Sequence, residues 1–270
     1  MRRQNAYLPP LWNSYRVTAA TCFALLPPLA LTISERGVAI LLPLVVALAL
    51  AGGWAFAFSR LRHKPIDWHG IVTALVFILL APSTVPLWQQ GLALTFGLVL
   101  GDLIFGERGR GFLNASVVAL AFLLFSFPGI TSGTDGPSAA IAAGISGALL
   151  LVFGLLSWRI VVGFCIGLLA ITTLLGTSPD WTALQSATLI LGLVFLIGDP
   201  VAAASTNVGR WLYGGFSGGL LVILGQAGGG TVSLNAVVFT ALLASIFAPL
   251  IDQIVITANV RRRAKRQAHD

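Results

Sequence analysis

The positions of the basic residues relative to ten apolar stretches constrain this fold most strongly. If every stretch crosses a membrane, all of the 16 Lys and Arg residues except Arg36 fall on one side of it. Hydrophobic residues make up 57% of the chain and charged residues 9%, so the chain carries more apolar surface than a soluble domain of this length can bury. The sequence therefore predicts an integral membrane protein.

A crossing helix needs about 20 mostly apolar residues, because hydrocarbon offers no partner to backbone N–H and C=O groups. The predicted fold class is all-α, a polytopic membrane protein with about ten transmembrane helices. Eight glycines are expected to let neighbouring helices pack closely: Gly144, Gly147, Gly163, Gly167, Gly214, Gly215, Gly218 and Gly219. The expected helices span residues 15–33, 37–58, 68–80, 87–105, 114–127, 138–157, 160–175, 181–197, 211–224 and 232–257.

Basic residues favour the cytoplasmic side of a membrane, and here they place both termini in the cytoplasm. We expect a cytoplasmic segment over residues 1–14, one transmembrane domain over 15–259 and a basic tail over 260–270. The tail lies where anionic lipid headgroups attract it, which explains the net charge of +7 without a nucleic-acid partner. The expected location is the bacterial inner membrane, which the chain crosses many times.

The cysteines and histidines argue against a metal centre in this chain. Cys22 and Cys165 lie inside apolar stretches, where thiols behave as small hydrophobic groups. His63 and His69 lie at a connection and a helix start, and His269 lies in the tail, so no two face each other across a bundle as haem ligation requires. We expect neither haem nor iron–sulfur ligands.

Two polar stretches allow alternative interpretations. Residues 81–88 contain Pro82 and Pro86, which end a short apolar stretch and form either a broken helix lining a site or a plain external turn. Residues 101–114 form a glycine-rich connection in which Asn114 can cap the next helix. The start of that helix favours an anion, although a flexible hairpin explains the glycines equally well.

A third stretch places an acidic residue directly after an apolar helix. Asp199 is costly near hydrocarbon unless it is paired, hydrated or bound to a cation, which makes it a functional candidate. Alternatively, Asp199 begins a loop and Arg210 anchors the next helix at the headgroups. Asp102 follows Gly101 as Asp199 follows Gly198, so an internal repeat would make the two aspartates bracket one vestibule.

Several further motifs resemble those of the NqrB/RnfD family, the membrane flavoprotein subunits of the sodium-pumping NADH:quinone oxidoreductase and of the Rnf complex. The resemblance covers most of the chain after Ala74. It implies flavin-mediated electron transfer coupled to ion transport, in a subunit that is not an enzyme on its own. The motifs are LLAPSTVPLW (79–88), the glycine connection with NAS (114–116), SWR (157–159), DPV (199–201), TNVGRW (206–211), FAPLID (247–252) and ANVRRR (258–263).

The chain departs from the family at the flavin attachment site. The resemblance implies FMN bound through a threonine hydroxyl in the pattern Asp-x-x-Ser-Gly-Ala-Thr, on the outer side before the sixth helix. Residues 135–141 read DGPSAAI here, so Ile141 stands at the threonine position and has no oxygen to form the bond. FMN or another flavin is therefore expected to be held without a covalent bond, unless Ser138 merely caps the sixth helix.

The resemblance and the residue chemistry together nominate two sets of residues. The implied partners are other membrane subunits, membrane lipid and quinone. The alternative function is a non-redox transporter or scaffold that keeps the fold without the covalent flavin. The candidate flavin-binding residues are Asp135, Gly136, Ser138, Asn114, Thr206, Asn207 and Arg210, and the candidate ion-pathway residues are Asp102, Asp199 and Asp252.

Overall fold

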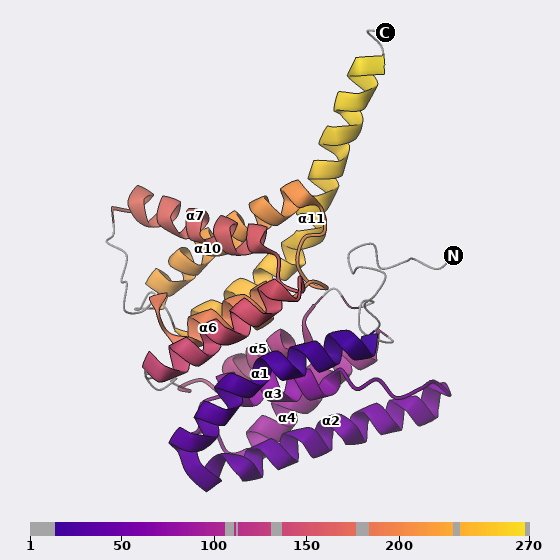
Figure 1. Ribbon diagram of the computed structural model, residues 1–270, viewed down its shortest axis with the longest axis vertical. Helices are drawn as coiled ribbons and strands as arrows, with labels where there is room; N and C mark the ends of the chain where they lie inside the picture. Colours follow the sequence, from indigo (N-terminus) through magenta and orange to yellow (C-terminus); the bar gives the residue numbers. More distant parts are fainter. Residues whose placement is uncertain are drawn as a thin grey trace.

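The computed structural model describes residues 14–105, 111, 113–130, 137–176, 184–228 and 233–267, and its secondary structure there is entirely helical (Figure 1). The predicted all-α class is thus confirmed for this part of the chain. The elements are α1 (Ser14–Arg36), η1 (Gly37–Ile40), α2 (Leu41–Arg62), α3 (Gly70–Leu80), α4 (Leu87–Leu98), η2 (Val99–Leu103), α5 (Ala115–Ser126), α6 (Pro137–Val152), α7 (Trp158–Leu174), α9 (Ala187–Leu191), η3 (Gly192–Ile197), α10 (Asn207–Ala227) and α11 (Leu234–Gln267).

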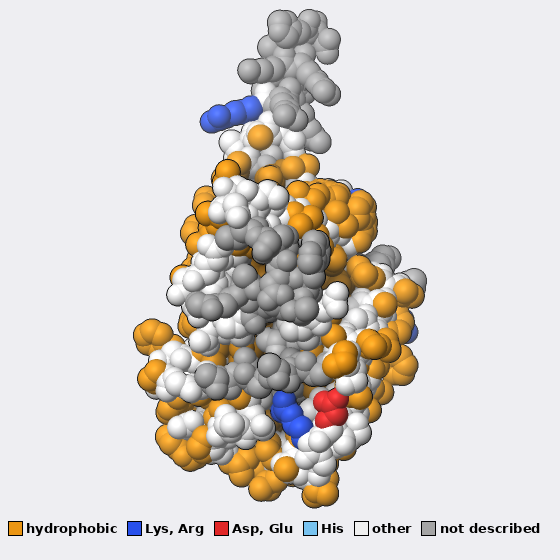
Figure 2. All heavy atoms as spheres, turned by 90° about the vertical axis from the view of Figure 1, so that its left-hand side faces the viewer, with side chains coloured by type: hydrophobic (Ala, Val, Ile, Leu, Met, Phe, Trp, Pro, Cys, Tyr) orange, Lys and Arg blue, Asp and Glu red, His pale blue; other side chains and the backbone are white. Residues whose placement is uncertain are grey.

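Two helical stretches, Ser14–Arg62 and Leu234–Arg261, are long and apolar enough to cross a membrane, and several shorter apolar helices accompany them. The first stretch turns back on itself at Gly37, whose φ of 62° suits glycine, so α1 and α2 form a hairpin. Hydrophobic side chains cover much of the described surface at the end shown in Figure 2, where a small patch of acidic and basic side chains interrupts them.

The first half of the chain (α1 to α5) and the second half (α6 to α11) repeat one packing pattern. In the first half α1 packs on α3, α2 on α4 and α4 on α5, while in the second α6 packs on α9, α7 on α10 and α10 on α11. The contact of α2 with α3 has no counterpart of similar size between α7 and α9 in the described residues. The halves meet where α1 contacts α6 and α5 contacts α11, which are equivalent helices in this pattern. Membrane transport folds often place their sites at such an interface between repeats.

Three expected boundaries were wrong. The helix expected over residues 181–197 begins only at Ala187, where Ser186 caps α9. Residues 181–183 lie outside the described part. The sixth helix ends at Val152 instead of residue 157, and Gly154 turns the chain with a φ of 71°. The last helix was expected to end at residue 257, but α11 continues to Gln267, away from the bundle (Figure 1).

Helices α7 and α10 lie side by side in the same direction, in direct backbone contact. A Cβ atom at Gly167 would overlap the carbonyl oxygen of Gly215, and one at Gly218 would overlap that of Phe164. Because glycine lacks a side chain, it lets two membrane helices approach this closely. The expected role in packing is therefore confirmed for Gly163, Gly167, Gly214 and Gly218, but it is wrong for Gly144, where an added Cβ atom would meet nothing within 4 Å.

Candidate functional site

Asn114 connects the two halves at the end of η3. Its side-chain oxygen accepts the Ser116 N–H at 2.8 Å, which confirms the predicted cap of α5. Its amide nitrogen donates to the Phe195 carbonyl at 2.9 Å and to Asp199 Oδ2 at 3.1 Å. In the π-helical register of η3, backbone carbonyl groups lose their usual α-helical N–H partners. The Asn114 amide acts as a replacement donor for one of these carbonyl groups, that of Phe195.

Asp199 lines two adjoining cavities of about 30 and 20 Å³, which we call together the Asp199 cavity. Asn114 and His69 line both parts, and Asp102 lines the smaller one. The structure thus brings Asp102 and Asp199 to one space, as the repeat of Gly-Asp in the sequence suggested. Each part has room for about one or two water molecules.

His69 is a member of this cavity that the sequence analysis did not select. It precedes α3, and its Nδ1 lies 3.4 Å from Thr18 Oγ1 of α1. Its backbone N–H donates to Asp67 at 3.0 Å, which fixes the start of the helix. His69 thus adds a polar imidazole ring to the part of the cavity that Asp102 and Asp199 also line.

Asp252, on α11, binds the start of α10. Its Oδ2 accepts the N–H and hydroxyl of Ser205, both at 2.7 Å, and its Oδ1 accepts the N–H and hydroxyl of Thr206 at 3.0 and 2.7 Å. Thr206 in turn caps α10 by accepting the Gly209 N–H at 3.0 Å. A Cβ atom at Gly209 would lie 2.6 Å from Asp252 Oδ1, so a larger residue there would displace the carboxylate from these hydrogen bonds.

Replacing Asp252 by alanine is expected to destabilise the protein by about 2 kcal/mol, because four donors of Ser205 and Thr206 lose their acceptor. The measurement is thermal unfolding of the detergent-purified chain. The neighbouring exposed Gln253, replaced by alanine, serves as the control and should leave the unfolding temperature unchanged. Equal unfolding temperatures for both variants would show that these hydrogen bonds contribute little.

A second cavity of about 30 Å³ lies further along the same helices, and we call it the Glu35 cavity. Thr32, Glu35 and Arg36 of α1 line it together with Thr188 of α9. Ser138 lies beside it, and its hydroxyl donates to Glu35 Oε1 at 2.8 Å. Capping of the sixth helix was the alternative interpretation of Ser138, but this residue lies within α6, which begins at Pro137, and its hydroxyl donates to Glu35.

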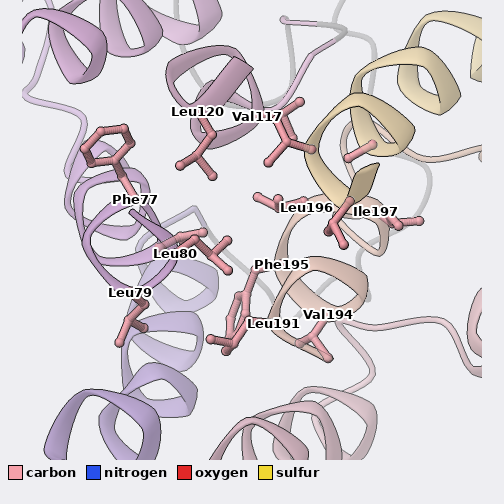
Figure 3. Packing of buried hydrophobic residues seen from close by; sticks show 14 of the residues in the cluster. Phe77, Leu79, Leu80, Val117, Leu120, Leu191, Val194, Phe195, Leu196 and Ile197 are labelled. Atoms are coloured by element: carbon pink, nitrogen blue, oxygen red, sulfur yellow. The ribbon is translucent and has the colours of Figure 1, made fainter. Parts of the chain in front are cut away.

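Only a thin apolar barrier separates the two cavities. On α3, Val76 lines the Asp199 cavity and Leu79 the Glu35 cavity, three residues apart or about 5 Å along the helix. From α9 to η3 the step is the same, from Leu191 to Val194. Figure 3 shows Leu80 of α3 on the side of that helix that faces Phe195 and Leu191, across the interface between the halves. The barrier is about one helical turn thick.

The candidate flavin residues do not form one site in the structure. Ser138 lies beside the Glu35 cavity, whereas Asn114 lines the Asp199 cavity on the other side of the barrier. Asn207 accepts a hydrogen bond from Arg159 at 3.2 Å at the start of α10. Ile141 is 66% exposed on α6. Thr206 is engaged with Asp252, Arg210 lies in the first turn of α10, and Asp135 and Gly136 lie outside the described residues.

Comparison with known proteins supports the resemblance seen in the sequence. Residues 7–136 and 129–261 match the model of the NQR2, RnfD, RnfE family. The chain is 30% identical to the NqrB subunit of the Na(+)-translocating NADH-quinone reductase of Pseudomonas aeruginosa (strain UCBPP-PA14), over 86% of this chain and 70% of that protein. It is 31% identical to the protein of the same name from Yersinia pestis, over 85% and 70% of the two chains.

Proposed function

Because the chain belongs to the NQR2, RnfD, RnfE family, we propose that it is an integral membrane subunit of an Nqr- or Rnf-like electron-transport complex. In this proposal it crosses the inner membrane about ten times, with both termini in the cytoplasm. The start of α1 and the end of α11 lie toward the same side of the molecule in Figure 1, which supports this orientation. Electron transfer through flavin is coupled to ion transport, and other membrane subunits supply the remaining redox centres.

The observation that best supports a role in ion transport is the thin apolar barrier between the Asp199 cavity and the Glu35 cavity. We assign the Asp199 cavity to the cytoplasmic side and the Glu35 cavity to the outer side. Carboxylate oxygens of Asp102 and Asp199 are suitable ligands for a hard cation, and an apolar constriction can gate its passage. Asp252 has a positioning role in this proposal, since it holds residues 205 and 206 at the start of α10.

The flavin is proposed to bind without a covalent bond at the start of α6. Asp135, Gly136 and Ser138 are the proposed contacts, and the positive end of the helix dipole favours the flavin phosphate there. Asn114, Thr206, Asn207 and Arg210 are not assigned to this flavin, because Asn114 lines the cavity beyond the barrier and the others lie at the start of α10.

Flavin should be released from the purified chain by denaturation, whereas the double variant Ala139→Gly/Ile141→Thr should retain FMN covalently when a flavin transferase is co-expressed. The double variant restores the Ser-Gly-Ala-Thr pattern of the family, and the hydroxyl acceptor would replace an exposed side chain. In-gel flavin fluorescence after denaturing electrophoresis measures the bond. Ala139→Gly alone is the control and should show no fluorescent band. Covalent FMN on the unmodified chain would contradict the proposal.

Ile141 also favours a second candidate function, a non-redox transporter or scaffold that keeps the family fold. With isoleucine at position 141, the chain lacks the hydroxyl to which relatives attach FMN. This difference leaves the lining of the Asp199 and Glu35 cavities unchanged, because Ile141 lines neither cavity. This function would be supported if the chain contains no flavin when it is purified gently, both alone and with its partner subunits.

A further inference from the structure

The starts of α7 and α10 lie next to each other. The two helices run in the same direction, and a Cβ atom at Gly163 would lie 2.8 Å from the carbonyl oxygen of Trp211. Each helix therefore places the positive end of its dipole at this one location. Two such ends side by side repel each other and favour a shared negative group.

Arginine and tryptophan side chains surround these helix starts. The Arg159 guanidinium lies 5.3 Å from the ring centroid of Trp158 and donates to Asn207 Oδ1 at 3.2 Å. The rings of Trp158 and Trp211 meet edge to face with centroids 5.4 Å apart. Arg210 adds a second cation from the first turn of α10. This arrangement fixes Arg159 above the start of α10.

Helices α7 and α10 contain no acidic residue to balance the charges of Arg159 and Arg210, since neither Trp158–Leu174 nor Asn207–Ala227 contains Asp or Glu. The carboxylate of Asp252 lies close to the start of α10, and both of its oxygens accept hydrogen bonds from residues 205 and 206. At the start of α7 no side chain caps the helix, and the buried Ser157 Oγ has no hydrogen-bond partner among the described residues. The two cations Arg159 and Arg210 thus outnumber the single carboxylate of Asp252 at this location.

We infer that this surface binds the phosphate of an anionic phospholipid in the cytoplasmic leaflet, an assignment that rests on the proposed membrane orientation. Tryptophan favours the headgroup level of a bilayer, and Trp158 is 53% exposed. Exposed apolar side chains continue from this point along both helices and offer a surface for the acyl chains of a lipid. A free anion such as phosphate has no acyl chains to contact this surface. The exposed apolar side chains are Val162, Ile166 and Leu169 of α7 and Val208, Leu212 and Phe216 of α10.

The test is native mass spectrometry of the full chain with dioleoyl phosphatidylglycerol or dioleoyl phosphatidylcholine. The unmodified chain should retain the anionic lipid in preference, and Arg159→Gln should lower that preference about fivefold, as expected for the loss of the cation that links the starts of the two helices. Arg159→Lys keeps the charge and should retain most of the preference. Arg60→Gln is the matched control, because Arg60 also covers an aromatic ring, that of Phe56, but lies at the end of a helix.

Equal retention of the two lipids by the unmodified chain would overturn the inference, as would an equal loss in Arg159→Gln and Arg60→Gln. A third arm adds inorganic phosphate alone to the detergent-purified chain and follows thermal unfolding. Stabilisation by inorganic phosphate equal to that by phosphatidylglycerol would assign the surface to a free anion and overturn the lipid assignment. Stabilisation by the lipid alone supports it.

Discussion

Gly218→Val is expected to remove most of the folded protein. A side chain at this position would overlap the carbonyl oxygen of Phe164 and lie 2.8 Å from the Leu168 nitrogen, and backbone atoms in a helix cannot move aside. Helices α7 and α10 must then separate along their whole contact. We expect a loss of about 3 kcal/mol or more, measured as the folded fraction in fluorescence-detected gel filtration.

Gly144→Val is the matched control for this prediction. Gly144 lies in an apolar helix like Gly218, but a Cβ atom there meets nothing within 4 Å. The control should give the same folded fraction as the unmodified chain. If Gly218→Val behaves like the control, the backbone contact between α7 and α10 is not what holds them together.

Asp199→Asn is expected to lower ion transport at least about tenfold, which corresponds to about 1.4 kcal/mol in the barrier. The amide can still accept the hydrogen bond of Asn114, but it lacks the charge that replaces the hydration of a cation in the cavity. The measurement is ²²Na⁺ uptake and internal acidification in inverted membrane vesicles that contain the complete complex and are energised with NADH.

Asp67→Asn is the control for the transport prediction. Asp67 accepts the His69 N–H at 3.0 Å, and asparagine can cap a helix start equally well, so this change removes a charge without loosening α3. It should leave transport unchanged. Unaltered transport in Asp199→Asn, with normal amounts of the complex in the membrane, would exclude Asp199 from the ion route.

The sequence predicted those features that depend on local chemistry. Ten apolar stretches predicted the helical class, Asn114 was identified as a cap, and Gly163, Gly167, Gly214 and Gly218 were assigned to close packing. The repeat of Gly-Asp at residues 101 and 198 also predicted that the two aspartates share one cavity. A stronger sign of repetition went unused, since Leu-Asn-Ala occurs at residues 113–115, where α5 starts, and again at residues 234–236, where α11 starts.

The sequence could not predict features that arise from long-range packing. The π-helical turns η2 and η3 depend on the hydrogen-bond register, which no residue type specifies. His69 joins the Asp199 cavity because α1 and α3 pack together, across 51 residues of chain. Asp252 was expected in an ion pathway because it is acidic, matches an acidic position of the family and lies at a predicted cytoplasmic helix end. Its four hydrogen bonds to Ser205 and Thr206 appear only once α11 is placed against α10.

Cysteine labelling tests most directly the central claim that the two cavities open to opposite sides of the membrane. The substitutions are Thr32→Cys in the Glu35 cavity and Val201→Cys in the Asp199 cavity, in a chain with Cys22 and Cys165 replaced by serine. In right-side-out vesicles an impermeant thiol reagent should label Thr32→Cys, and it should label Val201→Cys only after the vesicles are inverted. Labelling of both positions from the same side would contradict the account.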